Sequence, residues 1–451
     1  MGTTLIHSGT LVCMDAAGTV TRGDLLAEGT AIAALGATAT AALRGAAPEL
    51  SIDASGCFVL PGFVHAHLHL CQTLLRGLAE EADLLRWLRE KIWPLEAAHT
   101  EGSVAASARL GLAELIAGGV TTVNDMGTVH HTARIGEVLA ESGIRAVFGK
   151  ALMDRAGSAP AALCESTRDA LEAALDLARQ FHGSAGGRLS VALAPRFVLS
   201  CTRELWHGVR DASKQQALHV HTHLAESAGE AREVEAVVGA TAAQFFAREA
   251  VLSPRFVGAH GVWLEASELS SLAREGAALV HCPGSNLKLG SGLARVREWK
   301  RAGLRCGLGS DGAACNNRLD TFHELSLASG ISRVTDGAQA LSAREVLELA
   351  TRGGAEALGM GDLTGSLEVG KQADVIVVDA ETLHAAPRPE TDAYAALVQA
   401  ARAGDVRLTM VAGRVLYRDG AWTTLDSERA RSDARSEALG LVRRAESGVT
   451  R

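Results

Sequence analysis

The chain has 451 residues, of which 47% are hydrophobic and 21% charged, and its formal net charge is −8 at pH 7. Nucleic-acid binding depends on lysine and arginine that neutralise phosphates, so this acidic balance argues against such a partner. No apolar run reaches the ~18 residues of a membrane span, and the N-terminus lacks a basic region followed by an apolar core. We therefore expect a globular, cytoplasmic protein that neither crosses a membrane nor binds nucleic acid.

Residues 1–56 carry short alternating apolar segments punctuated by glycine, a pattern typical of strands and hairpins. Over residues 57–360, short β-branched runs alternate with longer segments of helical period, which indicates repeated βα units. We therefore predict an α/β fold, a (β/α)₈ TIM-like barrel, in which the chemistry lies on the loops at the carboxyl ends of the strands. The eight predicted strands end near Val64, Val123, Lys150, Pro195, Val220, Ala259, Val280 and Gly309.

The strand pattern of the first 56 residues returns over residues 361–425. We expect the two segments to fold together into one small β-sandwich-like module built from both chain ends. Residues 426–451 are rich in arginine, glutamate and serine, which indicates a solvated helix or tail at the C-terminus.

Three histidines alternate where the first predicted barrel strand ends, at His65, His67 and His69. Side chains two residues apart on an extended segment point the same way, so a His-x-His pair can hold one metal ion. The residues by themselves leave open whether the pair is His65 and His67 or His67 and His69.

A second cluster follows the fifth predicted strand, in the segment His219–Glu226, which alternates three histidines and ends in a glutamate. His260 and Asp311 each end a further strand-like run. Imidazole nitrogens with one carboxylate suit a borderline cation such as Zn²⁺ or Fe²⁺, and an open coordination position makes such a site catalytic.

Five motifs along nearly the whole chain resemble the amidohydrolase superfamily, in particular its branch of cytosine, guanine and adenosine deaminases. The motifs are Pro-Gly-x-x-x-x-His-x-His at residues 61–69, His-x-x-Glu at 223–226, Ala-His at 259–260, His-Cys-Pro-x-Ser-Asn-Leu at 281–287 and Ser-Asp-Gly-Ala at 310–313.

The resemblance implies one divalent metal ion per chain, zinc with iron as the alternative. The fourth predicted strand ends at Arg196 without a lysine, so the carbamylated lysine that bridges two metals in other branches has no candidate. His65 falls outside the motif, at a position where the family usually has a different polar residue. The implied metal ligands are His67, His69, His223 and Asp311.

The same resemblance assigns the catalytic roles. Glu226 is the implied proton shuttle, Asp311 accepts a proton from the attacking water, and His260 hydrogen-bonds that water or the substrate. The implied reaction is a hydrolytic deamination of a ring carbon, in which general acid–base groups assist a metal-activated water.

The motifs for the substrate divide between two families. The segment Trp87–Glu96 resembles deaminases of 5′-modified adenosines such as 5′-deoxyadenosine, methylthioadenosine and S-adenosylhomocysteine, in which the residue matching Glu96 binds the ribose. Gln72 and Arg196 instead resemble guanine deaminase, where the matching residues hold the oxo face of the base. We favour the adenosine type, with guanine, 8-oxoguanine, triazine and pterin aminohydrolases as alternatives. The candidate substrate-binding residues are Glu96, Arg196, Gln72 and Trp93.

The alternative to an enzyme is a non-catalytic protein, a metal-free barrel that only scaffolds an assembly. Such homologues lose metal ligands, whereas this sequence keeps all of those implied. We therefore expect an enzyme that acts on a small-molecule purine or purine nucleoside and assembles as a homo-oligomer.

Overall fold

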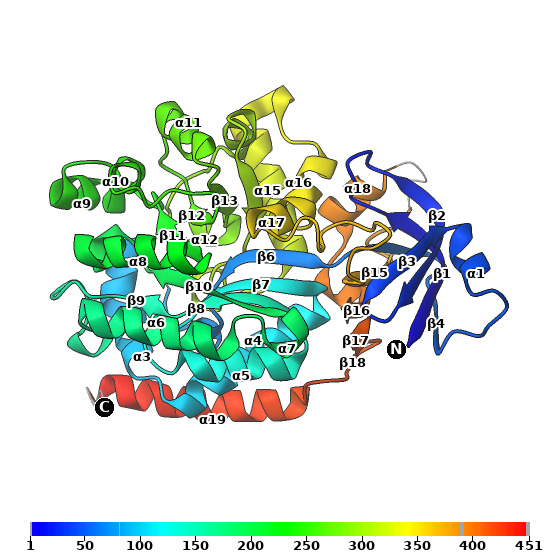
Figure 1. The fold of residues 1–451 in the computed structure, drawn as a ribbon, viewed down its shortest axis with the longest axis horizontal. Helices are drawn as coiled ribbons and strands as arrows, with labels where there is room; N and C mark the ends of the chain where they lie inside the picture. Colours follow the sequence, from blue (N-terminus) through cyan, green and yellow to red (C-terminus); the bar gives the residue numbers. More distant parts are fainter. Residues whose placement is uncertain (1, 81, 388–391, 448–451) are drawn as a thin grey trace.

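The computed structural model describes residues 2–80, 82–387 and 392–447, which form a barrel and an adjoining sheet module (Figure 1). Eight parallel strands lie in the order β11-β12-β13-β14-β6-β7-β8-β10, and pairing of β10 with β11 closes the barrel. This confirms the predicted (β/α)₈ architecture. The strands are β6 (Phe63–Leu68), β7 (Val120–Met126), β8 (Arg145–Gly149), β10 (Leu189–Pro195), β11 (His219–Leu224), β12 (Phe256–His260), β13 (Ala278–His281) and β14 (Arg305–Leu308), with the short β9 (Ala151–Leu152) beside the end of β10.

Three barrel strands run further than the sequence pattern indicated. β7 ends at Met126, three residues past Val123, and β6 and β11 end at Leu68 and Leu224, four residues beyond their predicted ends. Successive side chains of a strand point to opposite faces, so a strand can carry polar residues at alternate positions without losing its apolar contacts. His67 and His223 therefore stand on strands, and His69 follows directly after β6.

Helices cover the outside of the barrel, and α6 (Thr167–Phe181) shows why they form. The Ser166 side chain caps its first turn, and its apolar residues recur at helical spacing on the side that packs against the barrel: Ala170, Ala174, Leu177 and Phe181. The other main helices are α4 (Glu101–Ala117), α5 (Thr132–Ser142), α8 (Arg203–Gln216), α9 (Ala228–Val238), α10 (Ala242–Arg248), α11 (Ala266–Arg274), α13 (Val296–Arg301), α15 (Thr321–Asp336), α16 (Ala343–Leu349) and α17 (Arg352–Ala357).

Shorter helical segments lie over the mouth of the barrel and in its loops. After β6 the chain forms the 3₁₀ helix η1, and a continuous stretch then passes from α2 through a π-helical turn, η2, into α3. Their bounds are η1 (Leu70–Leu75), α2 (Leu84–Trp87), η2 (Leu88–Ile92), α3 (Trp93–Ala97), α7 (Ser184–Gly187), α12 (Pro283–Lys288) and α14 (Ala313–Asn316).

Both chain ends contribute to the second sheet, as predicted. Its order is β18-β17-β16-β15-β5-β1-β2-β3, with β4 paired to β1. β5 joins the two chain ends, because it pairs with β1 on one side and with β15 on the other. Since β5 spans Cys57–Pro61, the sheet extends past residue 56, where the first part of the module was expected to end. The strands are β1 (Thr3–Val12), β2 (Val20–Glu28), β3 (Ala31–Gly36), β4 (Leu50–Asp53), β5 (Cys57–Pro61), β15 (Val375–Asp379), β16 (Val406–Val411), β17 (Arg414–Arg418) and β18 (Ala421–Trp422), with α1 (Thr38–Ala42) and α18 (Ala393–Ala395) beside them.

The C-terminal segment is a helix, α19 (Ser427–Glu446), which lies along α4 on the outside of the barrel (Figure 1). It buries Ala430, Ala434 and Leu441. Arg444 Nε donates a hydrogen bond of 2.8 Å to the carbonyl of Ala98. The helix therefore continues the layer that covers the barrel.

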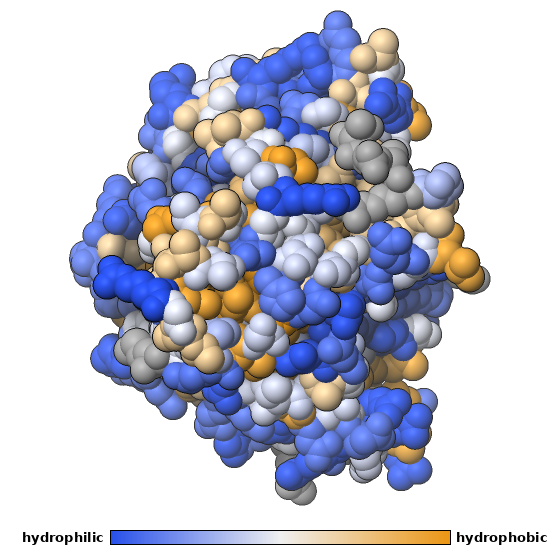
Figure 2. Space-filling model, turned by 90° about the vertical axis from the view of Figure 1, so that its right-hand side faces the viewer, coloured by the Kyte–Doolittle hydropathy of each residue, from blue (hydrophilic) through white to orange (hydrophobic). Residues whose placement is uncertain are grey.

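None of the described helices combines the length and the apolar character that a membrane crossing needs. Figure 2, which looks onto the module end of the molecule, shows a largely hydrophilic surface with hydrophobic residues in small groups. Isolated apolar residues of this kind are ordinary on a protein surface.

A buried ion pair connects the barrel to the module. Arg145 of β8 donates to Asp374 with Nε–Oδ2 and Nη2–Oδ1 distances of 2.9 and 3.2 Å, and the side chains are 3% and 0% exposed. The Asp374 carboxylate also accepts a hydrogen bond of 2.7 Å from the backbone N–H of Ala412. The backbone carbonyl of Asp374 accepts a hydrogen bond from the backbone N–H of Gly62. The carboxylate thus holds together segments from the barrel and from the module.

We predict that Arg145→Met strongly destabilises the protein, because it leaves the Asp374 carboxylate buried without its counter-charge. Breaking one side of a buried pair costs about 3–5 kcal/mol. Urea unfolding monitored by circular dichroism measures the effect, with Arg168→Met, at an 85% exposed arginine, as the matched control. Equal unfolding midpoints for the two variants would contradict the prediction.

Candidate active site

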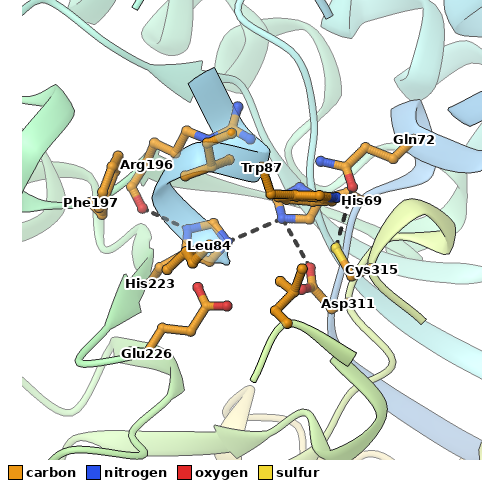
Figure 3. Close-up of a pocket in the computed structure, with 12 residues that line it drawn as sticks. His69, Gln72, Leu84, Trp87, Arg196, Phe197, His223, Glu226, Asp311 and Cys315 are labelled. Carbon is orange, nitrogen blue, oxygen red and sulfur yellow. Dashed lines mark hydrogen bonds and ion pairs between the residues drawn. The ribbon is translucent and has the colours of Figure 1, made fainter. Parts of the chain in front are cut away.

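Histidine and aspartate side chains from four strand ends meet at the mouth of the barrel. Figure 3 shows three of them, His69, His223 and Asp311. His69 Nε2 lies 3.1 Å from His223 Nε2 and 3.3 Å from Asp311 Oδ1. His67 Nε2 lies 3.4 Å from the same Asp311 oxygen, and His260 Nε2 lies 3.9 Å from Asp311 Oδ2. Donor atoms of His67, His223, His260 and Asp311 all lie within 4.8 Å of one another. The structure therefore brings every predicted metal ligand into one cluster, with His260 beside them.

Four histidines of the cluster, His67, His69, His223 and His260, each form a hydrogen bond through Nδ1 to a group outside the cluster. An Nδ1–H that donates to an outer partner fixes the tautomer and leaves the Nε2 lone pair facing inward. The outer partners are the carbonyl of Met126 for His69 at 2.8 Å, the carbonyl of Arg196 for His223 at 2.7 Å, Asn286 Oδ1 for His260 at 2.9 Å and His221 Nε2 for His67 at 2.7 Å.

The cluster has the properties that a metal site needs. His67 Nε2 and His260 Nε2 are buried and have no hydrogen-bond partner among the described residues. Two ligands about 2.0–2.1 Å from a tetrahedral ion lie about 3.3 Å apart, which matches the spacing of the cluster atoms. Ser285 Oγ and the backbone N–H of Gly312 donate to the Asp311 carboxylate at 2.7 and 2.9 Å and fix its orientation. The residues present therefore fit a divalent metal ion.

Glu226 stands beside the cluster, with its carboxyl group pointing toward the space between His223 and Asp311 (Figure 3). Its Oε2 lies 3.6 Å from His260 Nε2, and Ser291 Oγ lies 3.4 Å from its Oε1. Burial, and then the nearby carboxylates of Asp311 and Glu230, raise the pKa of Glu226 well above its usual value. This shift favours the protonated form of Glu226, which can give its proton to a substrate atom.

A cavity with an atom-free volume of about 370 Å³ opens onto these groups. Its polar wall consists of four residues of the cluster region with three further polar residues, and its apolar wall includes Trp87 and Phe197; the polar residues are His69, His223, Glu226, Asp311, Gln72, Arg196 and Cys315. A mostly apolar cavity with a few converging polar groups is typical of a small-molecule site.

The apolar wall holds residues that the sequence analysis missed. Both tryptophans are 2% exposed, but only Trp87 is among the described residues that line the cavity. Both tryptophans lie in the same segment, and only the direction of each side chain separates them. The remaining apolar lining residues are Leu84, Leu88, Phe197 and Leu289.

The three polar substrate-binding candidates form one buried network. Arg196 donates to Glu96 with Nη1–Oε2 and Nη2–Oε1 distances of 2.5 and 3.2 Å, and Gln72 Nε2 donates to Glu96 Oε1 at 2.9 Å. Burial by itself raises the pKa of Glu96, but the Arg196 guanidinium outweighs burial and holds the pKa below its usual value. Glu96 is therefore a carboxylate. It does not line the cavity itself but lies behind Gln72 and Arg196, which do.

His65 faces away from the cluster. Its Nε2 lies 2.8 Å from Thr321 Oγ1, and Ser310 Oγ lies 3.2 Å from its Nδ1. Of the two histidine pairs that the sequence left open, the geometry thus brings together His67 and His69.

A family model for the amidohydrolase family matches residues 58–416. The chain belongs to the amidohydrolase family. It is 37% identical to a 5-methylthioadenosine/S-adenosylhomocysteine deaminase of Halobacterium salinarum, over 95% of this chain and 96% of that one. It is 34% identical to a 5′-deoxyadenosine deaminase of Methanothermobacter thermautotrophicus, over 94% and 96% of the two chains.

A solved structure described as a zinc-bound adenosine deaminase from Xanthomonas campestris superposes with a TM-score of 0.91 at 32% identity, over 98% of both chains. This amidohydrolase therefore shares its whole architecture, barrel and module alike, with a metal-binding relative.

We predict that His223→Ala abolishes metal binding, because it removes an inward-facing nitrogen, whereas His65→Asn retains about one metal ion per chain. Elemental analysis of the purified variants measures the metal content, and thermal unfolding confirms that both are folded. Equal metal loss in both variants would show that His65 takes part in binding.

Proposed function

We propose that this amidohydrolase hydrolytically deaminates an aminopurine nucleoside, with a 5′-modified adenosine such as 5′-deoxyadenosine, methylthioadenosine or S-adenosylhomocysteine as substrate. The observation that carries the proposal is the position of Glu226, a buried acid with a raised pKa, in the same cavity as the cluster around Asp311. Relatives whose names denote deaminases of such nucleosides support it.

We further propose one metal ion per chain, zinc in preference to iron, because a related structure contains zinc. The ligands would be His67, His69, His223 and Asp311. His260 lies on the side of Glu226, 3.6 Å from its carboxyl group, which suits a residue that handles the attacking water. When bound, the ion supplies a Lewis acid that activates water at neutral pH.

The side chains of the cavity would carry the proton transfers. Asp311 accepts a proton from the attacking water, and its orientation is already fixed by Ser285. Glu226 delivers a proton to the ring nitrogen next to the carbon under attack. His260 holds the water in line with that carbon through Nε2, because its Nδ1 is engaged with Asn286. Asp311 would then pass its proton to the amino group and the Glu226 carboxylate would take the proton of the new hydroxyl, so that ammonia leaves as the carbonyl forms.

Glu96 would take part in ribose binding from behind Gln72 and Arg196, which line the cavity themselves. A carboxylate has about four acceptor positions, and Gln72 and Arg196 occupy three of them, so neither residue engages the remaining position on Oε2. A guanine-type oxopurine is the second candidate substrate, because Gln72 and Arg196 line the cavity themselves.

We predict that Glu226→Gln keeps the metal ion but lowers kcat by roughly 10²–10⁴, the usual contribution of a general acid–base group. The amide preserves the shape of the side chain and cannot shuttle the proton. Steady-state kinetics with elemental analysis measures both properties. A variant with nearly normal kcat would remove Glu226 from the mechanism.

We predict that the purified enzyme deaminates 5′-deoxyadenosine, methylthioadenosine or S-adenosylhomocysteine faster than guanine or 8-oxoguanine. The ultraviolet absorbance change on loss of the amino group measures turnover of each compound under the same conditions. Turnover of guanine without turnover of any adenosine analogue would assign the enzyme to the oxopurine class, and the metal chemistry would be unaffected.

A further inference from the structure

Glu324 is a buried carboxyl group that the proposed mechanism does not use. It lies on α15, is 0% exposed, and contacts the two segments that follow β13 and β14. Burial is the main cause that raises the pKa of Glu324 to about 8. Because an ionisable group is costly to bury unless hydrogen bonds compensate it, the contacts of Glu324 indicate what the residue is kept for.

One oxygen of Glu324 holds the start of α12. Glu324 Oε2 accepts the backbone N–H of Gly284 at 2.8 Å. The first N–H groups of a helix have no partner within the helix, and among the described residues the N-cap Cys282 gives α12 no side-chain cap. Gly284 allows the close approach, because a Cβ at this position would overlap Glu324 Oε1. A carboxyl group from α15 therefore caps α12.

The helix α12 carries the outer partners of two residues of the cluster. Ser285 Oγ donates to Asp311 Oδ2 at 2.7 Å. Asn286 Oδ1 accepts from His260 Nδ1 at 2.9 Å. Both partners directly follow Gly284 in the chain and are 0% and 1% exposed. The position of α12 therefore determines the direction of the Asp311 carboxylate and of the His260 ring.

The second oxygen of Glu324 reaches the segment after β14. Glu324 Oε1 accepts from Asn316 Nδ2 at 3.3 Å, and the same amide donates to the backbone carbonyl of Ser310. Asn316 Oδ1 accepts the backbone N–H of Arg318 at 2.7 Å, which fixes the orientation of the amide. Because Ser310 directly precedes Asp311, one carboxyl group connects α12 to the segment that carries Asp311.

We propose that Glu324 is a positioning residue that orients Asp311 and His260 by holding α12. The assignment rests on the proposed function for the roles of these two residues. Glu324 is not among the described residues that line the cavity, so it acts through Ser285 and Asn286 and not on the substrate. Groups held in their working geometry need no rearrangement during the reaction, which is how such outer contacts increase the rate.

The test replaces Glu324 by methionine, which fills a similar volume without acceptor oxygens. We expect Glu324→Met to lower kcat for 5′-deoxyadenosine by roughly 10- to 100-fold, the usual effect of an outer partner of a metal site. KM should stay nearly unchanged, because Glu324 lies outside the cavity wall. The affinity for Zn²⁺, measured by competition with a chelator, should fall by roughly tenfold, because Asp311 is one of the ligand candidates.

A conservative variant separates the two contacts of the carboxyl group. Glu324→Gln keeps one oxygen for the Gly284 N–H, while its NH₂ group faces the Asn316 amide and cannot accept from it. We expect kcat and the affinity for Zn²⁺ of Glu324→Gln to lie between those of the wild type and of Glu324→Met. The same variant provides both readouts if the methionine variant does not fold.

Two further measurements separate positioning from a general loss of stability. Glu268→Met is the matched control, because Glu268 is 5% exposed and accepts a backbone N–H, that of Glu265 at 2.8 Å, at the start of α11. This control should leave kcat and the affinity for Zn²⁺ unchanged, and thermal unfolding compares the stability of the variants. In a Ser285→Ala background, Glu324→Met should lower the affinity for Zn²⁺ by less than it does alone, because both substitutions act through one contact.

Three results would overturn the assignment while the proposed function stands. They are a fall in kcat and Zn²⁺ affinity no larger in Glu324→Met than in Glu268→Met, a raised KM at constant kcat, and an undiminished effect of Glu324→Met in the Ser285→Ala background. If the wild type turned over no nucleoside, the proposed function would be wrong. The affinity for Zn²⁺ would then still decide whether Glu324 orients Asp311.

Discussion

The chemistry of this molecule depends on the direction in which buried imidazoles present their two nitrogens. His69 and His223 each hydrogen-bond a backbone carbonyl through Nδ1, so that their Nε2 atoms face the centre of the histidine cluster. The carbonyls belong to Met126, at the end of β7 beside β6, and to Arg196, directly after β10 beside β11, so the register of the barrel determines which nitrogen faces inward. Burial also lowers the pKa of His67 to about 4, although Asp311 opposes this shift. The rings are therefore neutral, the form in which imidazole binds metals.

Arg196 links the histidine cluster to Glu96. Its carbonyl accepts from His223 at 2.7 Å, while its guanidinium pairs with Glu96. Backbone and side chain of one residue therefore serve two different parts of the site. The end of β10 is rigid because it is paired on both sides within the barrel, so neither part can shift without the other.

Much of the fold was predictable from the sequence because its signals are local. The eight barrel strands are short apolar runs between helices of regular period, and the histidines that form the cluster stand at their ends. The ends of β6 and β11 were not predictable, because a histidine whose side chain points into the barrel mouth is compatible with either strand or loop. That Trp87 lines the cavity and Trp93 does not was also not predictable, since a π-helical turn lies between them and breaks the regular helical period.

The contact between Glu96 and Arg196 shows what the sequence pattern cannot express. The two residues are 100 positions apart, and each was assigned to a different substrate family by its own local motif. Only the closed barrel brings them together, and their motifs then describe one network and not two competing sites. Long-range pairing of this kind follows from topology and leaves no local periodicity.

The position of β5 affects how the chain reaches this structure. β5 precedes the barrel, yet one of its neighbours, β15, lies beyond the barrel's last strand. During synthesis on a ribosome, the edge of β5 therefore stays unpaired until nearly the whole chain has emerged. The entropic cost of closing so long a loop grows only slowly with its length, so the consequence is kinetic more than thermodynamic. An open, apolar strand edge is a template for association between nascent chains, which makes this step the one at which a chaperone would protect the protein.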